Sequence, residues 1–381
     1  MTLRMAMIGG GKGSLIGPVH KMASTLDSMI SLVAGSFSSD PGITRETGEI
    51  FRLDPSRVYD TWQEMIEKEG SRTGADRINI IAIATPNHQH YQQVMAALNA
   101  GFHVVCDKPL TVSVEQAREI RDKVEETGLF FCLTHNYTGY PMVVKAREMV
   151  ESGSLGVIRK VAMEYFQGWM TTRVEDTDNK QAAWRSDPAK AGIAGCMADI
   201  GTHAFNMAEY ITGSRVESVL ARLNKIVEGR ELEDDGSVIA DMDNGAVMTL
   251  LASQIATGEE NNLVARIYGT LGGIEWRQQE PNTLIVKWRD RPMEIYRTGT
   301  GFSTMGEVAP LYTRLPSGHP EGFIEAFANI YHNFALHLTA HIEGREHDNR
   351  LIYPGIEEGV RGMQFLEAIV KSSAEKQVVN L

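Results

Sequence analysis

The first third of the chain alternates short apolar runs with stretches in which apolar residues recur at helical spacing. The apolar runs read as buried strands: residues 3–8, 29–36, 78–84, 103–107 and 129–134. Helices are expected between them; Ser113 and Gln116, for example, form a capping box, and Gly128 stands where that helix should end. Such alternation predicts one parallel sheet with right-handed crossovers and helices on its faces. We therefore predict a doubly wound α/β domain over residues 1–136.

After about residue 136 the pattern changes. A helix over residues 142–150 and a strand over 158–166 lead into a polar loop, and a helix is expected to start near Asp199. Several strands follow between residues 216 and 296 without intervening helices, which predicts antiparallel neighbours. A long loop (298–319) and two helices (322–343 and 355–373) complete the chain. Residues 137–381 are thus expected to form an α+β domain with a large, open, mostly antiparallel sheet.

Composition narrows the class of protein. The 381 residues suffice for about two or three domains. A net charge of −12 without a long Lys/Arg run argues against nucleic-acid and anionic membrane partners. No apolar run approaches the roughly 20 residues that span a bilayer, and the first residues do not resemble a signal peptide, so we expect a cytoplasmic protein. Cys106, Cys132 and Cys196 lack the spacing of a disulfide framework or a zinc site.

A glycine cluster over residues 9–17 lies between the first strand and the first helix. Glycines at this turn allow positive φ angles and close approach of backbone amides to an anion, and the helix N-terminus adds partial positive charge. These are the requirements for binding a dinucleotide pyrophosphate, although the spacing is neither G-x-G-x-x-G nor that of a P-loop, and a purely structural turn is the alternative. The candidate residues are Gly9, Gly11, Lys12, Gly13, Ser14, Leu15 and Ile16.

The end of the second strand bears on the choice between NAD and NADP. An acidic residue about 20 residues after the glycines would bind the ribose hydroxyls of NAD. Here the chain has Ser38, Ser39 and Asp40, with no carboxylate at the strand tip itself. Asp40 favours NAD, whereas Lys12 or Arg45 could bind the 2′-phosphate of NADP, so NAD is expected and NADP is not excluded.

The motifs come in an order that resembles the Gfo/Idh/MocA oxidoreductases. They occupy residues 9–20, 85–90 (TPNHQH), 107–109 (DKP), 184–185 (WR) and 199–203 (DIGTH), and the resemblance extends over essentially the whole chain. It implies an N-terminal Rossmann domain, a C-terminal α/β domain with a large open sheet, and NAD or NADP as the cofactor. Most members oxidise or reduce ring hydroxyls of sugars and cyclitols, usually as homodimers or homotetramers.

The resemblance also implies further cofactor-binding positions. Asn87 matches a position that approaches the ribose on the nicotinamide side. The other candidates are Thr85, Pro86, His90, Asp107, Lys108, Asn136, Trp184 and Arg185.

Three residues are candidates for catalysis. Lys108 follows a buried strand at its carboxyl end, the side where α/β sheets bind ligands. Asp199 and His203 are four residues apart, so on a helix they would share one face. Histidine can accept a proton near neutral pH, and a carboxylate one turn away can orient it. We expect His203 to be the base, with Lys108 in the same proton network; a turn lysine and an exposed helix end are the alternatives outside the family.

Residues near the expected domain junction and in the polar loop are candidates for substrate contact: His135, Tyr137, Tyr140, Trp169 and Lys180. Simple packing at the junction and an ordinary solvated loop are the alternatives. His337 and His341 are also four residues apart, but they lack the glutamate of H-E-x-x-H, so no metal site is expected.

The leading hypothesis is an NAD(P)-dependent dehydrogenase that acts on a sugar, glycoside or cyclitol. The first alternative is a glycoside hydrolase that oxidises C3 of its substrate transiently, eliminates the aglycone, adds water and reduces C3 again. Such an enzyme needs a base for C2, for which Tyr137 or Tyr140 is a candidate. The second alternative is a regulator that senses the cofactor.

Overall fold

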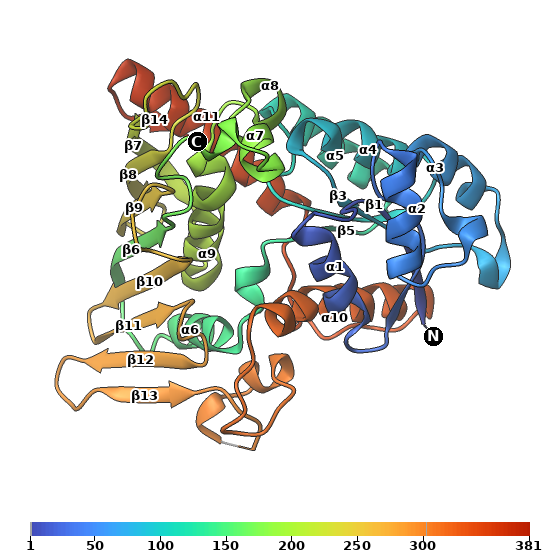
Figure 1. Ribbon diagram of the computed structural model, residues 1–381. Coiled ribbons are helices and arrows are strands. Elements are labelled where there is room, and N and C mark those ends of the chain that lie inside the picture. Colours follow the sequence, from blue (N-terminus) through green and yellow to red (C-terminus); the bar gives the residue numbers. More distant parts are fainter. Residues whose placement is uncertain (1, 302) are drawn as a thin grey trace. The chain divides into compact units, whose positions relative to one another are not determined.

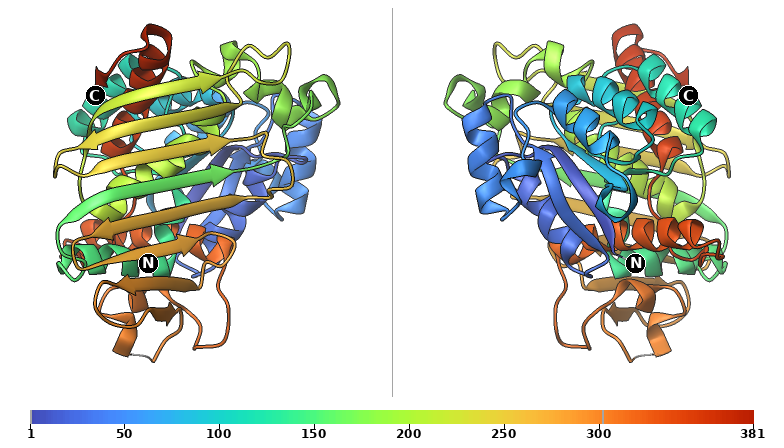
Figure 2. Two further views of the ribbon diagram at one scale, coloured as in Figure 1. Left: turned by 90° about the vertical axis from the view of Figure 1, so that its left-hand side faces the viewer. Right: turned by 90° about the vertical axis from the view of Figure 1, so that its right-hand side faces the viewer.

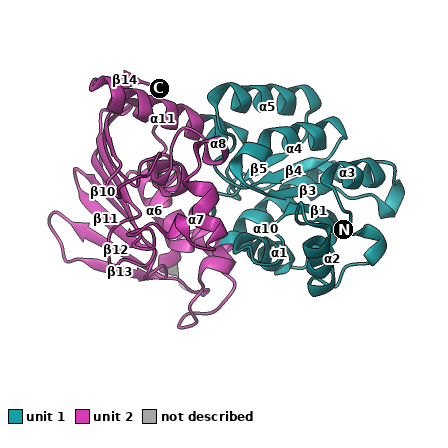
Figure 3. Ribbon diagram, turned by 45° about the horizontal axis from the view of Figure 1, so that its top comes forward, with its two compact units in different colours: residues 1–136, 327–360 teal, residues 137–326, 361–381 magenta. Residues whose placement is uncertain are grey.

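The computed structural model describes residues 2–301 and 303–381 (Figure 1). The chain forms two compact units, coloured separately in Figure 3: residues up to 136 with 327–360 form unit 1, and residues 137–326 with 361–381 form unit 2. The division after Asn136 is where the sequence analysis also placed it. Residues 327–360, however, lie in unit 1 and not in the C-terminal domain to which the sequence analysis assigned them.

Contacts within unit 1 explain this difference. The hydroxyl of Tyr331, on helix α10 (Phe323–Ile342), lies 2.6 Å from Nδ1 of the buried His20. The backbone N–H of Leu133 donates a hydrogen bond of 2.8 Å to the carbonyl of Pro354. Residues distant in sequence therefore complete the first unit.

Unit 1, in its described residues, contains a five-stranded sheet in the order β2-β1-β3-β4-β5, in which every pairing is parallel. The central strand β3 is buried along its whole length, as expected when helices cover both faces. The predicted doubly wound parallel sheet is confirmed. Its strands are β1 (Leu3–Gly9), β2 (Ile30–Ser36), β3 (Ile80–Ala84), β4 (His103–Cys106) and β5 (Phe131–Leu133).

Helices α3, α4 and α5 pack side by side along this sheet (Figure 1). The ring of His20 on α1 contacts the ring of Tyr331 on α10. The predicted capping box is present, since Ser113 Oγ accepts a hydrogen bond from the backbone N–H of Gln116 at the start of α5. The helices of the N-terminal part are α1 (Ile16–Thr25), α2 (Pro41–Ile50), α3 (Trp62–Gly70), α4 (Asn87–Asn99) and α5 (Val114–Thr127).

The described strands of unit 2 form a nine-stranded sheet in the order β13-β12-β11-β10-β6-β9-β8-β7-β14. The pair β6 and β9 is parallel and the other pairs are antiparallel, which confirms a large, mostly antiparallel sheet. Figure 2 (left) shows one broad face of this sheet without helices over it. The strands are β6 (Ile158–Phe166), β7 (Val216–Asn224), β8 (Asp235–Met242), β9 (Val247–Ser253), β10 (Asn262–Gly269), β11 (Gly272–Arg277), β12 (Thr283–Trp288), β13 (Glu294–Arg297) and β14 (Val379–Asn380).

Two loops predicted in this unit contain short helices. The polar loop after β6 holds α7 (Lys180–Arg185) and α8 (Pro188–Ala191), because Asn179 and Asp187 cap their N-termini through side-chain oxygens. The loop over residues 298–319 includes 3₁₀ turns at Ser303–Met305 and Ala309–Tyr312, and residue 302 of that loop lies outside the described residues. The remaining helices are α6 (Pro141–Glu151), α9 (Thr202–Thr212) and α11 (Ile356–Glu375).

Over residues 2–301 and 303–381, we find no helix that combines the length and the apolar character required to cross a membrane.

Candidate active site

The glycine loop between β1 and α1 depends on residues without a side chain, because a Cβ at some of its positions would clash with neighbouring backbone. Gly13 has a φ of +87° and nothing within 4 Å of where a Cβ would be, so the surrounding space is open. A Cβ on Gly17 would lie 1.9 Å from the carbonyl oxygen of Gly10, so the first turn of α1 approaches the loop too closely for another residue. The sequence analysis missed the role of Gly10 and Gly17. The loop is thus packed closely against α1 at Gly17 and is open at Gly13, as the binding of a pyrophosphate by backbone N–H groups requires.

The charged residues near the end of β2 are engaged with one another. The Asp40 carboxylate caps α2 and accepts hydrogen bonds from the backbone N–H groups of Gly42 (2.7 Å) and Ile43 (3.4 Å). Lys12 forms an ion pair with Glu46. Arg45 forms one with Asp60 at 3.1 Å. Both cations considered for a 2′-phosphate therefore already hold protein carboxylates. Ser38 and Ser39 lie beside this cap, where Ser38 Oγ accepts from the N–H of Asp40.

His90 joins two of the predicted cofactor-binding turns. Its Nε2 lies 2.8 Å from the carbonyl oxygen of Thr85, and its Nδ1 lies 3.0 Å from that of Pro109. The imidazole is fully buried, and burial lowers its pKa although both carbonyls raise it. His90 therefore supports these turns from inside unit 1, and Asn87 is buried in the first turn of the same helix, α4.

Asp107 and Lys108 follow β4 directly, and the peptide bond between Lys108 and Pro109 is cis. Burial raises the pKa of Asp107, but the side chains of His20 and Thr134 and the positive charge of Lys108 outweigh it and bring the pKa to about 2. Burial and the charge of Lys108 lower the pKa of His135 to about 3. Asp107 is thus an anion and His135 is neutral beside the Lys108 ammonium.

Asp199 lies in a π-helical turn, Met197–Gly201, that leads into α9. The expectation of a regular helix from Asp199 is corrected here. Glu233 accepts hydrogen bonds from the backbone N–H groups of Gly195 (2.8 Å) and Met197 (2.9 Å), and so occupies donors at the start of the turn. Turns of this kind occur often at functional sites.

The buried carboxylate of Glu233 gives a test of how the π turn is held. Burial raises its pKa, while the N–H groups of Gly195 and Met197 lower it. We expect Glu233→Ala to reduce the free energy of unfolding by about 1–3 kcal/mol, because two buried donors lose their acceptor. Glu233→Gln is the matched control, since it keeps one acceptor oxygen and should lose less. Urea unfolding of both variants measures this; equal losses would contradict the assigned hydrogen bonds.

The side chains of Gln254 and Arg185 contact the Asp199 carboxylate. Its Oδ2 accepts a hydrogen bond of 2.8 Å from Nε2 of Gln254 and lies 3.2 Å from Nε of Arg185. The guanidinium of Arg185 also lies 4.3 Å from the ring centre of Trp184. Arg185, predicted as a cofactor-binding residue, thus contacts the candidate catalytic carboxylate.

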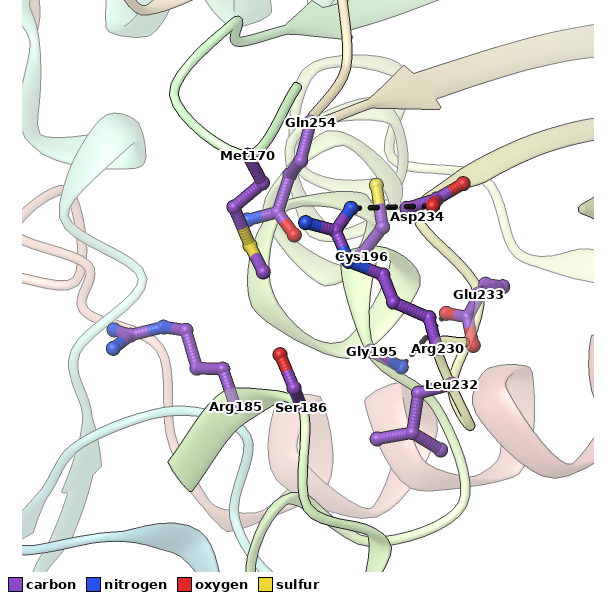
Figure 4. A pocket seen from close by; sticks show the side chains of 10 residues that line it. All are labelled: Met170, Arg185, Ser186, Gly195, Cys196, Arg230, Leu232, Glu233, Asp234 and Gln254. Atoms are coloured by element: carbon purple, nitrogen blue, oxygen red, sulfur yellow. Dashed lines mark hydrogen bonds and ion pairs between the residues drawn. The ribbon is translucent and has the colours of Figure 1, made fainter. Parts of the chain in front are cut away.

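The two side chains that contact Asp199, Arg185 and Gln254, also line a small pocket in unit 2 (Figure 4). Arg185, Ser186 and Gln254 line one part of it. Arg230 and Asp234, which form an ion pair at 3.2 Å, line another part. The residues that hold Asp199 are therefore themselves in contact with a polar, charged cavity.

His203 follows on α9 and is 7% exposed. Its ring meets the ring of Tyr137 edge to face, with 4.7 Å between the ring centres. The hydroxyls of Tyr137 and Tyr165 lie 2.6 Å apart, and Tyr165 donates to Oδ1 of Asn261 at 2.8 Å. Burial raises the pKa of both tyrosines, so both phenols stay protonated.

Amide side chains extend this group. Nε2 of Gln167 donates to Oδ1 of Asn261 at 2.6 Å, and Trp169 donates to Oε1 of Gln167 at 2.8 Å. We call Tyr137, Tyr165, Gln167, Gln254 and Asn261 the polar cluster. It brings together phenol and amide groups that can donate to or accept from several hydroxyls.

The sequence analysis missed most of the polar cluster. Gln167 and Gln254 come directly after β6 and β9, which are parallel, and Asn261 comes directly before β10, which is antiparallel to β6. All three therefore meet at one edge of the sheet. Polar residues next to apolar strands were the available signal, but the strand order was needed to connect them.

The remaining predicted residues have varied surroundings. Tyr140 is buried against Trp276, with ring centres 5.3 Å apart. Lys180 is exposed at the start of α7. Asn136 is 3% exposed, and its Nδ2 has no hydrogen-bond partner among the described residues.

The two histidines considered for a metal pack around an aromatic ring. The ring of Phe130 lies 4.7 Å from that of His337 and 4.9 Å from that of His341. In the part of the chain that the structure describes, no group of three or more His, Cys, Asp or Glu could hold a metal ion.

Comparison with protein families gives two matches. Residues 3–135 match the oxidoreductase family with an NAD-binding Rossmann fold. Residues 143–275 match the GFO/IDH/MocA C-terminal domain. The prediction of an NAD-binding domain is confirmed by the first match.

Individual relatives extend over most of the chain. An uncharacterized oxidoreductase of Bacillus subtilis is 34% identical over 99% of this chain and 96% of its own length. Levoglucosan dehydrogenase of Pseudarthrobacter phenanthrenivorans is 27% identical over 75% of this chain and 76% of its own. An inositol dehydrogenase homolog from Azotobacter vinelandii, crystallised with NAD⁺, gives a TM-score of 0.94 at 33% identity and covers 100% of this chain and 98% of that one. It was also crystallised with NADH and myo-inositol.

The two family matches, over residues 3–135 and 143–275, fall in unit 1 and unit 2 respectively and together span more than half of the chain. The chain therefore belongs to the Gfo/Idh/MocA family of oxidoreductases.

Proposed function

We propose that this protein is an NAD-dependent dehydrogenase that oxidises a ring hydroxyl of a sugar, glycoside or cyclitol. The observation that carries the proposal is the polar cluster next to His203, which offers phenol and amide groups to a substrate rich in hydroxyls. The relatives support this substrate class, since one is a levoglucosan dehydrogenase and another was crystallised with myo-inositol.

The residues of unit 1 fit NAD. The glycine loop supplies the open backbone turn for the pyrophosphate, and the buried Nδ2 of Asn136 is a donor without a partner in the described residues. We assign the remaining contacts to the predicted positions Thr85, Pro86 and Asn87. NAD, when bound, accepts the hydride from the carbinol carbon.

We propose the following roles for the protein groups. His203 removes the hydroxyl proton, Lys108 stabilises the oxygen as negative charge develops, and Asp199 orients the substrate and the base. Gln254 and Arg185 fix the Asp199 carboxylate, so it need not reorganise during the reaction. Trp169 and His135 are further candidates for substrate contact.

Cofactor choice can be tested at Lys12. We expect the protein to prefer NAD, because Glu46 and Asp60 already pair with Lys12 and Arg45, the two cations considered for a 2′-phosphate. Glu46→Gln should release Lys12 and raise kcat/KM for NADP by about twofold to fivefold, with little change for NAD. Glu49→Gln, on the same exposed part of α2, is the control. An unchanged NADP rate would argue against Lys12 as a neighbour of the 2′-phosphate.

The glycosidase alternative receives no support from the relatives named above. It would require Tyr137 or Tyr140 as the base for C2. Burial raises the pKa of both phenols, which keeps them protonated near neutral pH and so unable to accept a proton. The regulator alternative predicts that Lys108→Ala has no effect on any turnover.

The test uses NAD in substoichiometric amount with free sugars, cyclitols and aryl glycosides, while reduced nicotinamide and released aglycone are followed together. Reduced cofactor that accumulates to the amount supplied, without aglycone, would establish the dehydrogenase. Many aglycones released per cofactor would instead establish the hydrolase.

We also propose a homodimer or homotetramer. On the face of the nine-stranded sheet without helices, apolar side chains of neighbouring strands are exposed, among them Leu220 (41%) and Ile239 (53%). Exposed apolar patches commonly mark protein interfaces. A monomer in light scattering would contradict the proposal.

A further inference from the structure

The buried side chains of Tyr331, His20 and Thr134 lie in a row with the carboxylate of Asp107, whose side chain is 17% exposed, and the proposed mechanism does not use them. We call Tyr331, His20, Asp107 and Thr134 the buried row. Nδ1 of His20 lies 2.6 Å from the hydroxyl of Tyr331, and its Nε2 lies 3.7 Å from Oδ1 of Asp107. The Thr134 hydroxyl donates to the same Oδ1. All four belong to unit 1.

The proton positions in the buried row follow from its surroundings. Burial raises the pKa of Tyr331, so its hydroxyl keeps its proton and donates it to Nδ1 of His20. An imidazole that accepts a hydrogen bond at Nδ1 carries a hydrogen on Nε2. That N–H then faces the carboxylate of Asp107.

The surroundings of His20 offer its Nε2 few acceptors other than Asp107. Its side chain is 0% exposed and lies edge to face against Phe327, with 5.0 Å between ring centres. Nε2 has no hydrogen-bond partner among the described residues, so the Asp107 carboxylate is the anionic group toward which this donor is directed. Leaving a buried donor without a polar counterpart is unfavourable, which favours one orientation of the carboxylate.

We propose that His20 and Tyr331 are positioning residues for Lys108: they fix the Asp107 carboxylate, and this carboxylate in turn fixes the ammonium group of the next residue for proton transfer. The inference rests on the proposed catalytic role of Lys108. It adds that His20 on α1 and Tyr331 on α10 hold Lys108 in place through Asp107 without contacting the substrate.

Charged and polar groups surround Asp107. Several elements contribute groups that influence the pKa of Asp107 or whose pKa the charge of Asp107 influences. These groups are His20 on α1, His90 on α4, Cys106 and Lys108 on its own segment, Thr134 and His135 after β5, and Tyr331 on α10. Of these, His20 and Thr134 approach the carboxylate directly, and Lys108 carries the neighbouring positive charge. Loss of the His20 donor therefore leaves more of the carboxylate's charge to act on Lys108.

The experiment measures Lys108 directly. The full-length protein is labelled with trace acetic anhydride over a range of pH, and the peptide with Lys108 is quantified by mass spectrometry. We expect His20→Leu to move the labelling midpoint of Lys108 upward by roughly half a pH unit, and His20→Gln, which keeps a donor on that side, to restore most of it. Tyr331→Phe should give a smaller upward shift, and it serves as the second variant if His20→Leu does not fold.

Turnover is measured in parallel. We expect kcat to fall about tenfold in His20→Leu with little change in KM for NAD, because the support acts on proton transfer. Unchanged labelling midpoints in folded variants would overturn the inference, and so would a loss of stability alone. Full activity in Lys108→Ala would overturn the proposed function, while the labelling midpoints would still report on the buried row.

Discussion

Replacing Lys108 by methionine is expected to lower kcat about 10²–10⁴-fold, the usual contribution of a positioned proton-transfer group. Methionine keeps much of the length of the lysine side chain and removes only its charge and its protons. Since the charge of Lys108 lowers the pKa of both Asp107 and His135 in the native protein, the variant removes a charge that acts on both neighbours. Steady-state kinetics with the best sugar or cyclitol gives the loss.

The control for this variant is Lys68→Met. Lys68 is exposed on α3 and pairs with Glu64 one turn away, so its loss should leave kcat unchanged. Calorimetric titration with NAD should show that Lys108→Met still binds the cofactor. A Lys108→Met enzyme that turns over within threefold of the wild type would remove Lys108 from the mechanism.

His203→Asn is expected to have the second large effect, a fall in kcat of about 10²–10⁴-fold together with loss of the decline in rate at acid pH. Asparagine preserves a polar side chain of similar breadth against Tyr137, but it cannot accept and release a proton near neutral pH. The pH dependence of kcat, measured at saturating substrate, separates this effect from weaker binding.

Two comparisons make the result decisive. His319→Asn changes an exposed histidine of unit 2 and should have no effect. A double variant of Lys108 and His203 should be little worse than the poorer single variant, because groups that act as one unit are not additive. Fully multiplicative losses would mean that the two residues serve separate steps.

Much of the fold follows from local pattern. The five apolar runs of the first third became β1 to β5 with shifts of one or two residues, because parallel strands covered on both faces must be apolar throughout. Residues 327–360 could not be assigned in this way. Their membership of unit 1 depends on contacts such as Tyr331 with His20, which join positions 311 residues apart.

In the candidate site, too, residues in local motifs could be predicted, whereas residues brought in by distant contacts could not. Asp107, Lys108, Asp199 and His203 stand in short motifs and were predicted, whereas Gln254 was not. Its contact with Asp199 spans 55 residues and depends on the register of β9 beside β6. The π turn was also missed, because it depends on Glu233, which lies on a distant segment.

Because residues 327–360 belong to unit 1, the order of synthesis affects how this unit folds. Domains usually fold in order as they leave the ribosome. Here the amino-terminal unit must wait, because Tyr331 and Pro354 are synthesised long after the helix α1 and the strand β5 that they contact. A nascent chain that stops before residue 327 would present an unfinished nucleotide-binding domain with apolar surface exposed, a natural target for chaperones and proteases.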